Sequence, residues 1–157
     1  MIVTVTLNPS IDRTTPIAGP LRRGQVNRLG SSTEVAAGKG VNISRVLRGA
    51  GIETCAVVPA GAKGRLTLGL NHDDIPHQVV PVAAAVRTNL TITEPDGTTT
   101  KINEPGADLS PEELTAVEEA IVEKSSGAQW VVLSGSLPPG VPLSLIHISE
   151  PTRLLSI

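Results

Sequence analysis

The order of apolar and polar residues predicts strands that alternate with helices along most of the chain. Strands are expected at 2–7, 53–60, 78–82 and 129–133, where short apolar runs are bounded by glycine, proline or polar residues. Helices are expected at 41–47, at 66–70 and at 110–124, where Ser110, Pro111 and Glu113 form the start signal of a capping box. This alternation is typical of an α/β layered domain built on a largely parallel sheet.

Shorter β segments are expected outside that alternation. A polar turn at 8–12 follows the first strand, and 14–17, 26–29 and 35–36 are predicted as short, half-exposed strands. Two alternating segments around Pro95-Asp96-Gly97 predict a hairpin over 87–104. Because its faces are polar, we expect this hairpin to be an accessory flap at the edge of the core sheet.

Composition narrows the function classes. The 157 residues carry a net charge of −2, which argues against nucleic acid as a partner. No apolar run is long enough for a membrane span, and Cys55 lies in an apolar stretch that predicts a buried, inert thiol. One Trp and no Phe or Tyr argue against a site that stacks rings on aromatic faces. A cytoplasmic protein without a disulfide is expected.

The turn at 38–40, Gly-Lys-Gly, resembles a phosphate loop but matches neither common nucleotide motif. A Walker loop needs a hydroxyl where Val41 stands, and the dinucleotide fingerprint needs a third glycine where Ile43 stands. A Gly-x-Gly turn at a helix N-terminus, with Asn42 in the first turn, favours oxygen-rich or anionic ligands. A tight turn without any ligand fits the same residues equally well.

Three other polar groups admit both a ligand-binding and a structural interpretation. Asp12 follows the first strand and suits two sugar hydroxyls, or it caps a turn. In the hairpin, Arg87 and Asn89 share one strand face, although exposed hairpins are polar in any case. Ser134 and Ser136 end a buried strand and would also suit a plain loop.

Four segments in one order carry a resemblance to a known family. They are "TLNPSID", "AAGKGVN", "RTNLTI…TKINEPG" and "VVLSGSLPPG", and the resemblance runs from residue 2 to about 142. Each is weak alone, but together they resemble the N-terminal half of a phosphofructokinase-B-type carbohydrate kinase. The resemblance implies the N-terminal part of a ribokinase-like layered α/β domain with a β-hairpin lid.

The resemblance also implies roles for individual residues. Asp12 matches the aspartate that binds sugar hydroxyls, the segment 38–42 matches the Gly-rich sugar-binding turn, and the hairpin matches the lid, where cationic side chains would face the phosphate of the substrate. The positions assigned to the sugar phosphate are Asp12, Gly38, Lys39, Gly40, Asn42, Arg87, Asn89, Lys101, Glu104, Ser134 and Ser136. In relatives the lid can also form a homodimer contact.

The implied reaction, in a full-length parent, is the transfer of a phosphoryl group from ATP to fructose 1-phosphate, giving fructose 1,6-bisphosphate. Tagatose 6-phosphate and fructose 6-phosphate remain alternative substrates, and a non-catalytic sugar-phosphate-binding half-domain is a second interpretation. The family's catalytic base is the aspartate of a G-A-G-D motif, which this sequence lacks. We therefore assign no catalytic residue and no metal ligand here. ATP and Mg²⁺ belong to the parent, and this chain alone is expected to be inactive.

The last residues depart from the family pattern. Residues 143–153 read "LSLIHISEPTR", which resembles the translation of a sequencing adapter. We expect residues 1–142 to be the N-terminal portion of the kinase domain, with the lid strands, and residues 143–157 to be a non-native tail.

Overall fold

The computed structural model describes residues 1–142, which form two four-stranded sheets and three helices. The core sheet has the order β5-β4-β1-β8 and every pair in it is parallel. Its strands are β1 (Ile2–Val5), β4 (Thr54–Ala60), β5 (His77–Pro81) and β8 (Trp130–Leu133). The predicted α/β layered domain with a parallel sheet is therefore confirmed.

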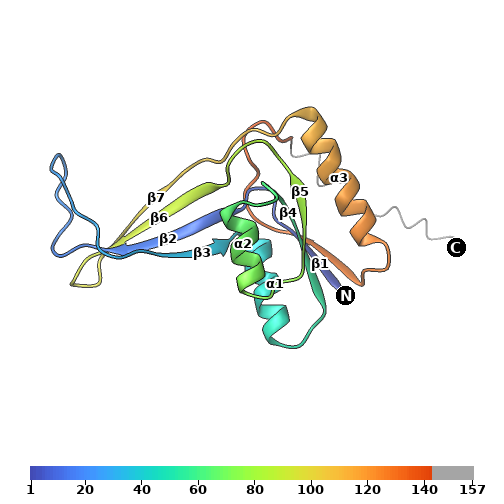
Figure 1. Cartoon of the computed structure of the whole chain (residues 1–157), viewed down its shortest axis with the longest axis horizontal. Coiled ribbons are helices and arrows are strands. Elements are labelled where there is room, and N and C mark those ends of the chain that lie inside the picture. The colour runs from blue at the N-terminus through green and yellow to red at the C-terminus, as the bar shows by residue number, and fades with distance from the viewer. Residues whose placement is uncertain (143–157) are drawn as a thin grey trace, which may run out of the picture.

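Helices cover both faces of the core sheet. α1 (Lys39–Gly49) and α2 (Arg65–His72) lie on one side, and α3 (Pro111–Ser125) lies on the other (Figure 1). The period of two along β4 explains this: Val57 packs into the cluster that holds Val117 of α3, whereas Val58 packs into the cluster that holds Val41 of α1. A strand buried on both faces reads as a continuous apolar run, as β4 does.

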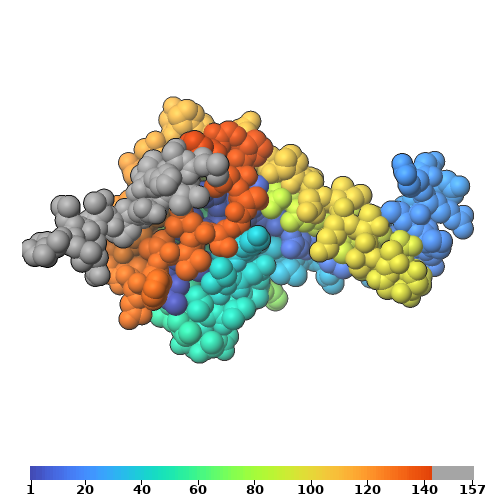
Figure 2. Space-filling model, turned by 180° about the vertical axis from the view of Figure 1, so that it is seen from behind, coloured from blue at the N-terminus to red at the C-terminus, as the bar shows by residue number. Residues whose placement is uncertain are grey.

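The second sheet is the lid, and it extends away from the core (Figure 1). Its strands are β2 (Ser10–Pro16), β3 (Thr33–Ala37), β6 (Arg87–Thr93) and β7 (Thr99–Asn103), in the order β3-β2-β6-β7. At its far end the loop around residues 18–30 (blue) and the turn around 94–98 (yellow) form two separate lobes (Figure 2). The Oε2 atom of Glu94 accepts the backbone N–H of Leu21 at 3.1 Å and so links the two segments at that end.

The expectation of an accessory flap is wrong in one respect. The hairpin is confirmed, but β6 pairs in parallel with β2, so the hairpin forms half of a sheet rather than an appendage to the core. The register sets Asp12 opposite Asn89, which are 77 residues apart in sequence. Pairing over that separation leaves no mark in the local alternation of either strand.

Two short segments also differ from expectation. The predicted polar turn at 8–12 ends early, because β2 begins at Ser10 and pairs with both β3 and β6. The predicted strand at 26–29 does not form: Leu29 makes one isolated bridge to Ile17, and Val26 is 83% exposed. Polar side chains on β2 are compatible with a strand because the lid face that carries them is not part of a hydrophobic core.

The start of α3 has the capping box that the sequence predicts. Ser110 Oγ accepts the backbone N–H of Glu113 at 3.2 Å, and Glu113 Oε2 accepts the N–H of Ser110 at 2.8 Å. The other oxygen, Oε1, accepts the N–H of Ala83 at 2.7 Å and so ties α3 to the segment after β5. The bonds from Ser110 and then Ala83 lower the pKa of Glu113 below its usual value of 4.5.

This pKa shift predicts a pH dependence of stability. Because the folded-state pKa is depressed, the contribution of Glu113 is complete above pH 4.5 and is lost as the pH falls through the folded-state pKa. Glu113→Gln should therefore lose less unfolding free energy than the unsubstituted chain between about pH 7 and about pH 3, measured by urea unfolding. The control is Glu119→Gln, an exposed position on the same helix. Equal losses in all three proteins would contradict the assignment.

Candidate functional site

The candidate site lies where the core sheet meets the lid. β1 ends at Val5 and β2 begins at Ser10, so residues 6–9 join the two sheets directly. The Gly-Lys-Gly turn between β3 and α1 and the serine loop after β8 lie at the same end of the core sheet as this connection. In open α/β sheets, ligands bind at this carboxyl end of the strands.

Both glycines of the turn are required by packing. Gly38 is the N-cap of α1 with φ +134°, and a Cβ there would lie 2.5 Å from Thr6 Cγ2. A Cβ at Gly40 would lie 2.5 Å from Thr6 Oγ1 and 2.8 Å from the carbonyl oxygen of Val5. These distances are shorter than any real contact, so only glycine lets α1 approach the end of β1 this closely.

The first turn of α1 retains two donors for a ligand. The N–H of Val41 donates to Thr6 Oγ1 at 3.0 Å, and the N–H of Asn42 donates to the carbonyl of Gly38 at 2.8 Å. The remaining first-turn N–H groups belong to Lys39 and Gly40, and the side chain of Lys39 is exposed. Part of the helix N-terminus is therefore used structurally, and part is open to an anion.

Asn42 has a partner that the sequence analysis missed. Arg45 Nη1 donates to Asn42 Oδ1 at 2.6 Å, and its Nη2 donates to the carbonyl of Ala36 at 2.5 Å and to Asp73 Oδ2 at 3.0 Å. The bond from Arg45 fixes the amide oxygen of Asn42, and the amide nitrogen of Asn42 remains able to donate to another group. The i, i+3 spacing of Asn42 and Arg45 in the predicted helix was the sequence feature that could have predicted this hydrogen bond.

A polar triad forms on the lid between β2 and β6. Asn89 Nδ2 donates to Asp12 Oδ1 at 2.9 Å and to Ser10 Oγ at 3.1 Å, and Ser10 Oγ donates to the same Asp12 oxygen at 2.9 Å. Ser10 was not anticipated as a partner, because the expected turn hid its strand pairing. The triad holds Asp12 by one oxygen, Oδ1, and the other oxygen accepts no hydrogen bond from residues 1–142.

The guanidinium of Arg87 is fixed by main-chain oxygens. Its Nη1 donates to the carbonyl of Glu104 at 3.0 Å and its Nη2 to the carbonyl of Asn8 at 3.4 Å. The carboxylate of Glu104 accepts the N–H of Thr88 at 2.7 Å, which extends the pairing of β6 with β7 by one bond. The expected sugar-facing role of Glu104 therefore competes with a structural one.

Two buried polar atoms beside the triad have no hydrogen-bond partner within residues 1–142. They are Arg87 Nε, a donor, and Asn89 Oδ1, an acceptor. Strand alternation places their side chains on the lid face that carries Asp12. Buried polar atoms are almost always paired in folded proteins, so an unpaired donor and an unpaired acceptor two positions apart on one strand face make this face a candidate for a ligand position.

The serine loop lies against the Gly-Lys-Gly turn. Gly135 has φ +126°, and a Cβ there would lie 3.9 Å from Lys39 Cβ. Ser134 and Ser136 line a cavity of about 300 Å³ whose other walls are Val5, Leu7, Leu133 and Leu137. These walls are mostly apolar and do not suit a charged ligand.

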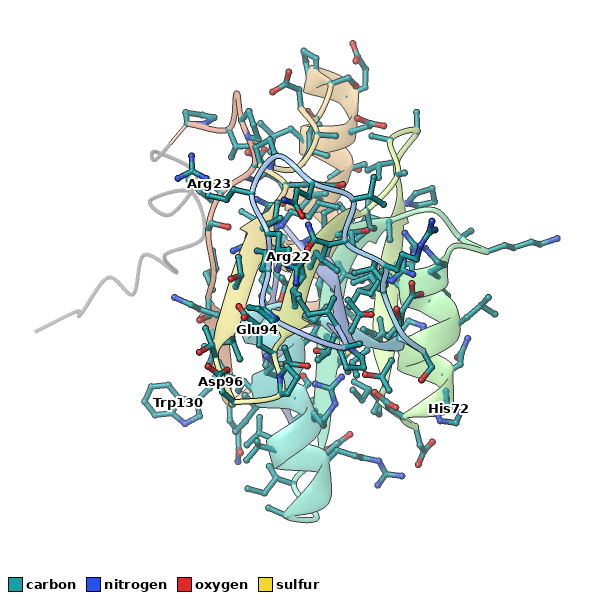
Figure 3. All side chains as sticks on the ribbon, turned by 90° about the vertical axis from the view of Figure 1, so that its left-hand side faces the viewer. Arg22, Arg23, His72, Glu94, Asp96 and Trp130 are labelled. Atoms are coloured by element: carbon teal, nitrogen blue, oxygen red, sulfur yellow. The ribbon has the colours of Figure 1, made fainter. Side chains whose placement is uncertain are left out.

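Lys101 is not drawn into the cluster. Lys101 lies on β7 and pairs with Thr91 of β6. This pair is one step farther out along the same lid face than Asn89 and Asn103, and the side chain of Lys101 is exposed. Trp130 is also remote: it begins β8, at the opposite end of the strand from the serine loop, and is 70% exposed (Figure 3). Its ring therefore provides no stacking surface for this site.

Comparison with known proteins identifies the family. Residues 5–148 match the family model described as pfkB family carbohydrate kinase, so the chain belongs to that family. The 1-phosphofructokinase of Vibrio cholerae is 32% identical over 145 residues, covering 89% of this chain and 44% of that protein. The ATP-dependent 6-phosphofructokinase isozyme 2 of Mycobacterium tuberculosis is 34% identical over 145 residues, covering 89% of this chain and 42% of that protein.

Solved structures support the same assignment. The crystal structure of phosphofructokinase-2 from Escherichia coli in complex with fructose-6-phosphate superposes with a TM-score of 0.85 at 32% identity, over 94% of this chain and 50% of that one. The chain spans less than half the length of the curated relatives named above. The family match also continues six residues beyond 142, and the proposed boundary of a non-native tail falls on residues outside the described part.

Residues 1–142 contain neither a helix suited to a membrane span nor a cluster of metal-binding side chains. None of the three helices in this part is both long and apolar enough to cross a bilayer. In the same residues, no group of three or more His, Cys, Asp or Glu side chains is arranged to hold a metal ion.

The contact between the Gly-Lys-Gly turn and β1 makes a testable prediction. Gly40→Ala should lower the free energy of unfolding by about 1–3 kcal/mol, because its Cβ collides with the backbone of Val5 as well as with Thr6. Gly49→Ala is the matched control at the other end of α1, where a Cβ meets nothing within 4 Å. That substitution should be neutral or stabilising by at most about 1 kcal/mol. Equal effects of the two substitutions in urea unfolding would disprove the packing argument.

Proposed function

We propose that residues 1–142 form the sugar-phosphate-binding half of an ATP-dependent kinase that acts on fructose 1-phosphate. In the whole protein the products would be fructose 1,6-bisphosphate and ADP. The observation that carries the proposal is the unpaired Arg87 Nε beside the unpaired Asn89 Oδ1, on the lid face that carries the Asp12 carboxylate. A sugar phosphate offers the matching groups, since its phosphate accepts from Arg87 and its hydroxyls donate to the amide and carboxylate oxygens.

Each proposed residue has a part in binding. Asp12 accepts sugar hydroxyls. Lys39 and Gly40 offer main-chain donors at the helix N-terminus, Gly38 shapes the turn, and Asn42 offers its side-chain amide nitrogen. Arg87 binds the phosphate that the substrate already carries, with Lys101 as a more distant cation on the same face. Glu104 and the two serines, Ser134 and Ser136, would border the sugar on the remaining sides. No catalytic base is assigned among these residues.

A second substrate deserves a separate test. The relatives divide between a 1-phosphofructokinase and a 6-phosphofructokinase, and the phosphofructokinase-2 structure is described as a complex with fructose-6-phosphate. Both sugars offer hydroxyls and one phosphate to the same donors. They differ in the carbon that carries the phosphate, and therefore in its distance from the hydroxyls that bind Asp12. Tagatose 6-phosphate and the non-catalytic binding half-domain stay as further alternatives.

The family and the ATP-dependent relative named above support ATP and Mg²⁺ as cofactors of a full-length kinase. Because the G-A-G-D motif is absent from this chain, we assign the nucleotide and its metal to the remainder of that kinase and derive no step through them here.

A lid-mediated homodimer and a cytoplasmic location complete the proposal. Val35 and Ile102 expose 46% and 55% of their surface, but the strand register places them on opposite faces of the lid. Ile102 lies on the face away from Asp12, and we propose that this face contacts a second lid. Cys55 was expected to be buried, but it is half-buried in the structure, and this partial burial raises the pKa of its thiol above the usual value of 9.0.

Binding of the phosphate by Arg87 is tested by calorimetry on the purified chain. Arg87→Ala should weaken fructose 1-phosphate binding about tenfold or more, the usual effect of losing a hydrogen bond to a charged group. Binding of unphosphorylated fructose should not change. The control is Arg48→Ala, which removes an exposed cation paired with Asp74 at the other end of α1. Unchanged fructose 1-phosphate affinity in Arg87→Ala would refute the assignment, and tighter binding of fructose 6-phosphate by the unsubstituted chain would favour that substrate.

The assignment of chemistry to the rest of the kinase is tested separately. The 157-residue chain, mixed with fructose 1-phosphate and Mg-ATP, should release no ADP above the rate without sugar. Sugar-dependent ADP release that is lost in Asp12→Asn would show that this chain contains a base that we have not identified.

A further inference from the structure

Asn8 lies at the junction of the two sheets, in the connection between β1 and β2, and it is 6% exposed. Its Nδ2 atom donates to the carbonyl of Pro105 at 2.9 Å and to Ser136 Oγ at 3.2 Å, with a longer contact of 3.4 Å to the carbonyl of Leu137. These partners are 97, 128 and 129 residues away in sequence. One buried amide therefore connects two loops that are far apart in the sequence.

The amide oxygen of Asn8 contacts one of these loops from the other side. Gly106 has φ +98°, and a Cβ on it would lie 2.3 Å from Asn8 Oδ1. The loop after β7 is thus packed directly on the amide group, with Pro105 bonded to its nitrogen and Gly106 pressed against its oxygen.

The two loops contain residues of the proposed site, whereas Asn8 is not one of the residues proposed to contact the sugar phosphate. Glu104 precedes Pro105, and Ser136 is bonded to Asn8 directly. The main-chain carbonyl of Asn8 also accepts from Arg87 Nη2. Asn8 thus touches the lid cation through its backbone and both loops through its side chain.

We propose that Asn8 is a positioning residue, whose amide sets the loop at 104–106 and the loop at 134–137 at the correct separation from the Asp12–Asn89 face of the lid. The inference rests on the proposed function, because it takes these loops as borders of the sugar-phosphate site. An amide is suited to this task because it donates two hydrogens and accepts on the other side within one planar group. A carboxylate of the same shape accepts only and would repel the carbonyl oxygens of Pro105 and Leu137.

The first test uses the isosteric change Asn8→Asp in the full 157-residue chain. Fructose 1-phosphate affinity should fall at least about tenfold, because the loops lose their common donor. The backbone amide resonances of Gly106, Ser136 and Leu137 in ¹⁵N spectra should shift without ligand, while those of α2 should not. The control is Asn71→Asp, which makes the same chemical change at an exposed position of α2 and should leave both readouts unaltered.

A second pair of variants leaves Asn8 in place, in case a buried carboxylate prevents folding. Gly106→Ala inserts a Cβ against the amide, whereas Gly127→Ala inserts one at φ +84° with nothing within 4 Å. Both introduce the same kind of backbone strain, so the difference between them reports the collision with Asn8. Gly106→Ala should weaken fructose 1-phosphate binding at least about tenfold relative to Gly127→Ala.

The possible outcomes separate this inference from the proposed function. If the unsubstituted chain binds no fructose 1-phosphate, the proposed function fails, and the loop resonances alone then decide whether Asn8 positions the loops. If the chain binds, unchanged affinity in both Asn8→Asp and Gly106→Ala overturns the positioning role, even where the resonances move. Unmoved resonances of Gly106 and Ser136 in Asn8→Asp overturn it as well.

Discussion

The close contact of Thr6 with the Gly-Lys-Gly turn is the constraint on which the site depends. Thr6 is buried directly after β1, and its side chain fills the spaces where Gly38 and Gly40 have no Cβ. The same hydroxyl accepts the first-turn N–H of Val41 and so fixes the start of α1. Because β3 runs into this turn from the lid, one contact sets the helix on the core and the lid strand beside it. The glycines that resemble a phosphate motif are thus explained by packing before any ligand is considered.

A second set of contacts joins the lid to the core at its root. Arg65, at the start of α2, donates to both carboxylate oxygens of Glu34 on β3, at 3.1 and 3.3 Å, and to Thr88 Oγ1 on β6 at 3.3 Å. Nearby, Gly69 of α2 is so close to Ala36 of β3 that a Cβ would lie 2.8 Å from the Cβ of that alanine. The lid is therefore anchored near the core and extends freely toward its tip, where Arg22 and Arg23 lie (Figure 3). Any lid movement must pivot about this root, which places Asp12 and Arg87 near the pivot and Lys101 farther out.

The sequence predicted the elements whose information is local. The capping box of α3, the hairpin turn at Pro95-Asp96-Gly97 and the apolar run of β4 are all read within a few residues, and the structure contains each of them. The parallel pairing of β2 with β6 could not be read in this way, because a polar strand face looks like a turn when its partner is 77 residues away. For the same reason the hydrogen-bond partners of Ser10 and Asn8 could not be predicted: they become neighbours only after the two sheets form.

In the proposed site, the ligand groups come from both sheets, and this has a consequence for binding. Asp12, Asn89 and Arg87 belong to the lid, whereas the helix N-terminus at Lys39 and Gly40 and the serine loop belong to the core. A sugar phosphate that contacts both sets replaces solvent at the junction and pairs Arg87 Nε and Asn89 Oδ1, whose partners are missing within residues 1–142. Since an unpaired buried polar atom costs about 1–3 kcal/mol, pairing two of them favours the geometry in which core and lid are correctly spaced. Substrate affinity and the spacing of the two sheets are then thermodynamically coupled, so a residue that touches no substrate can still influence which sugar phosphate fits.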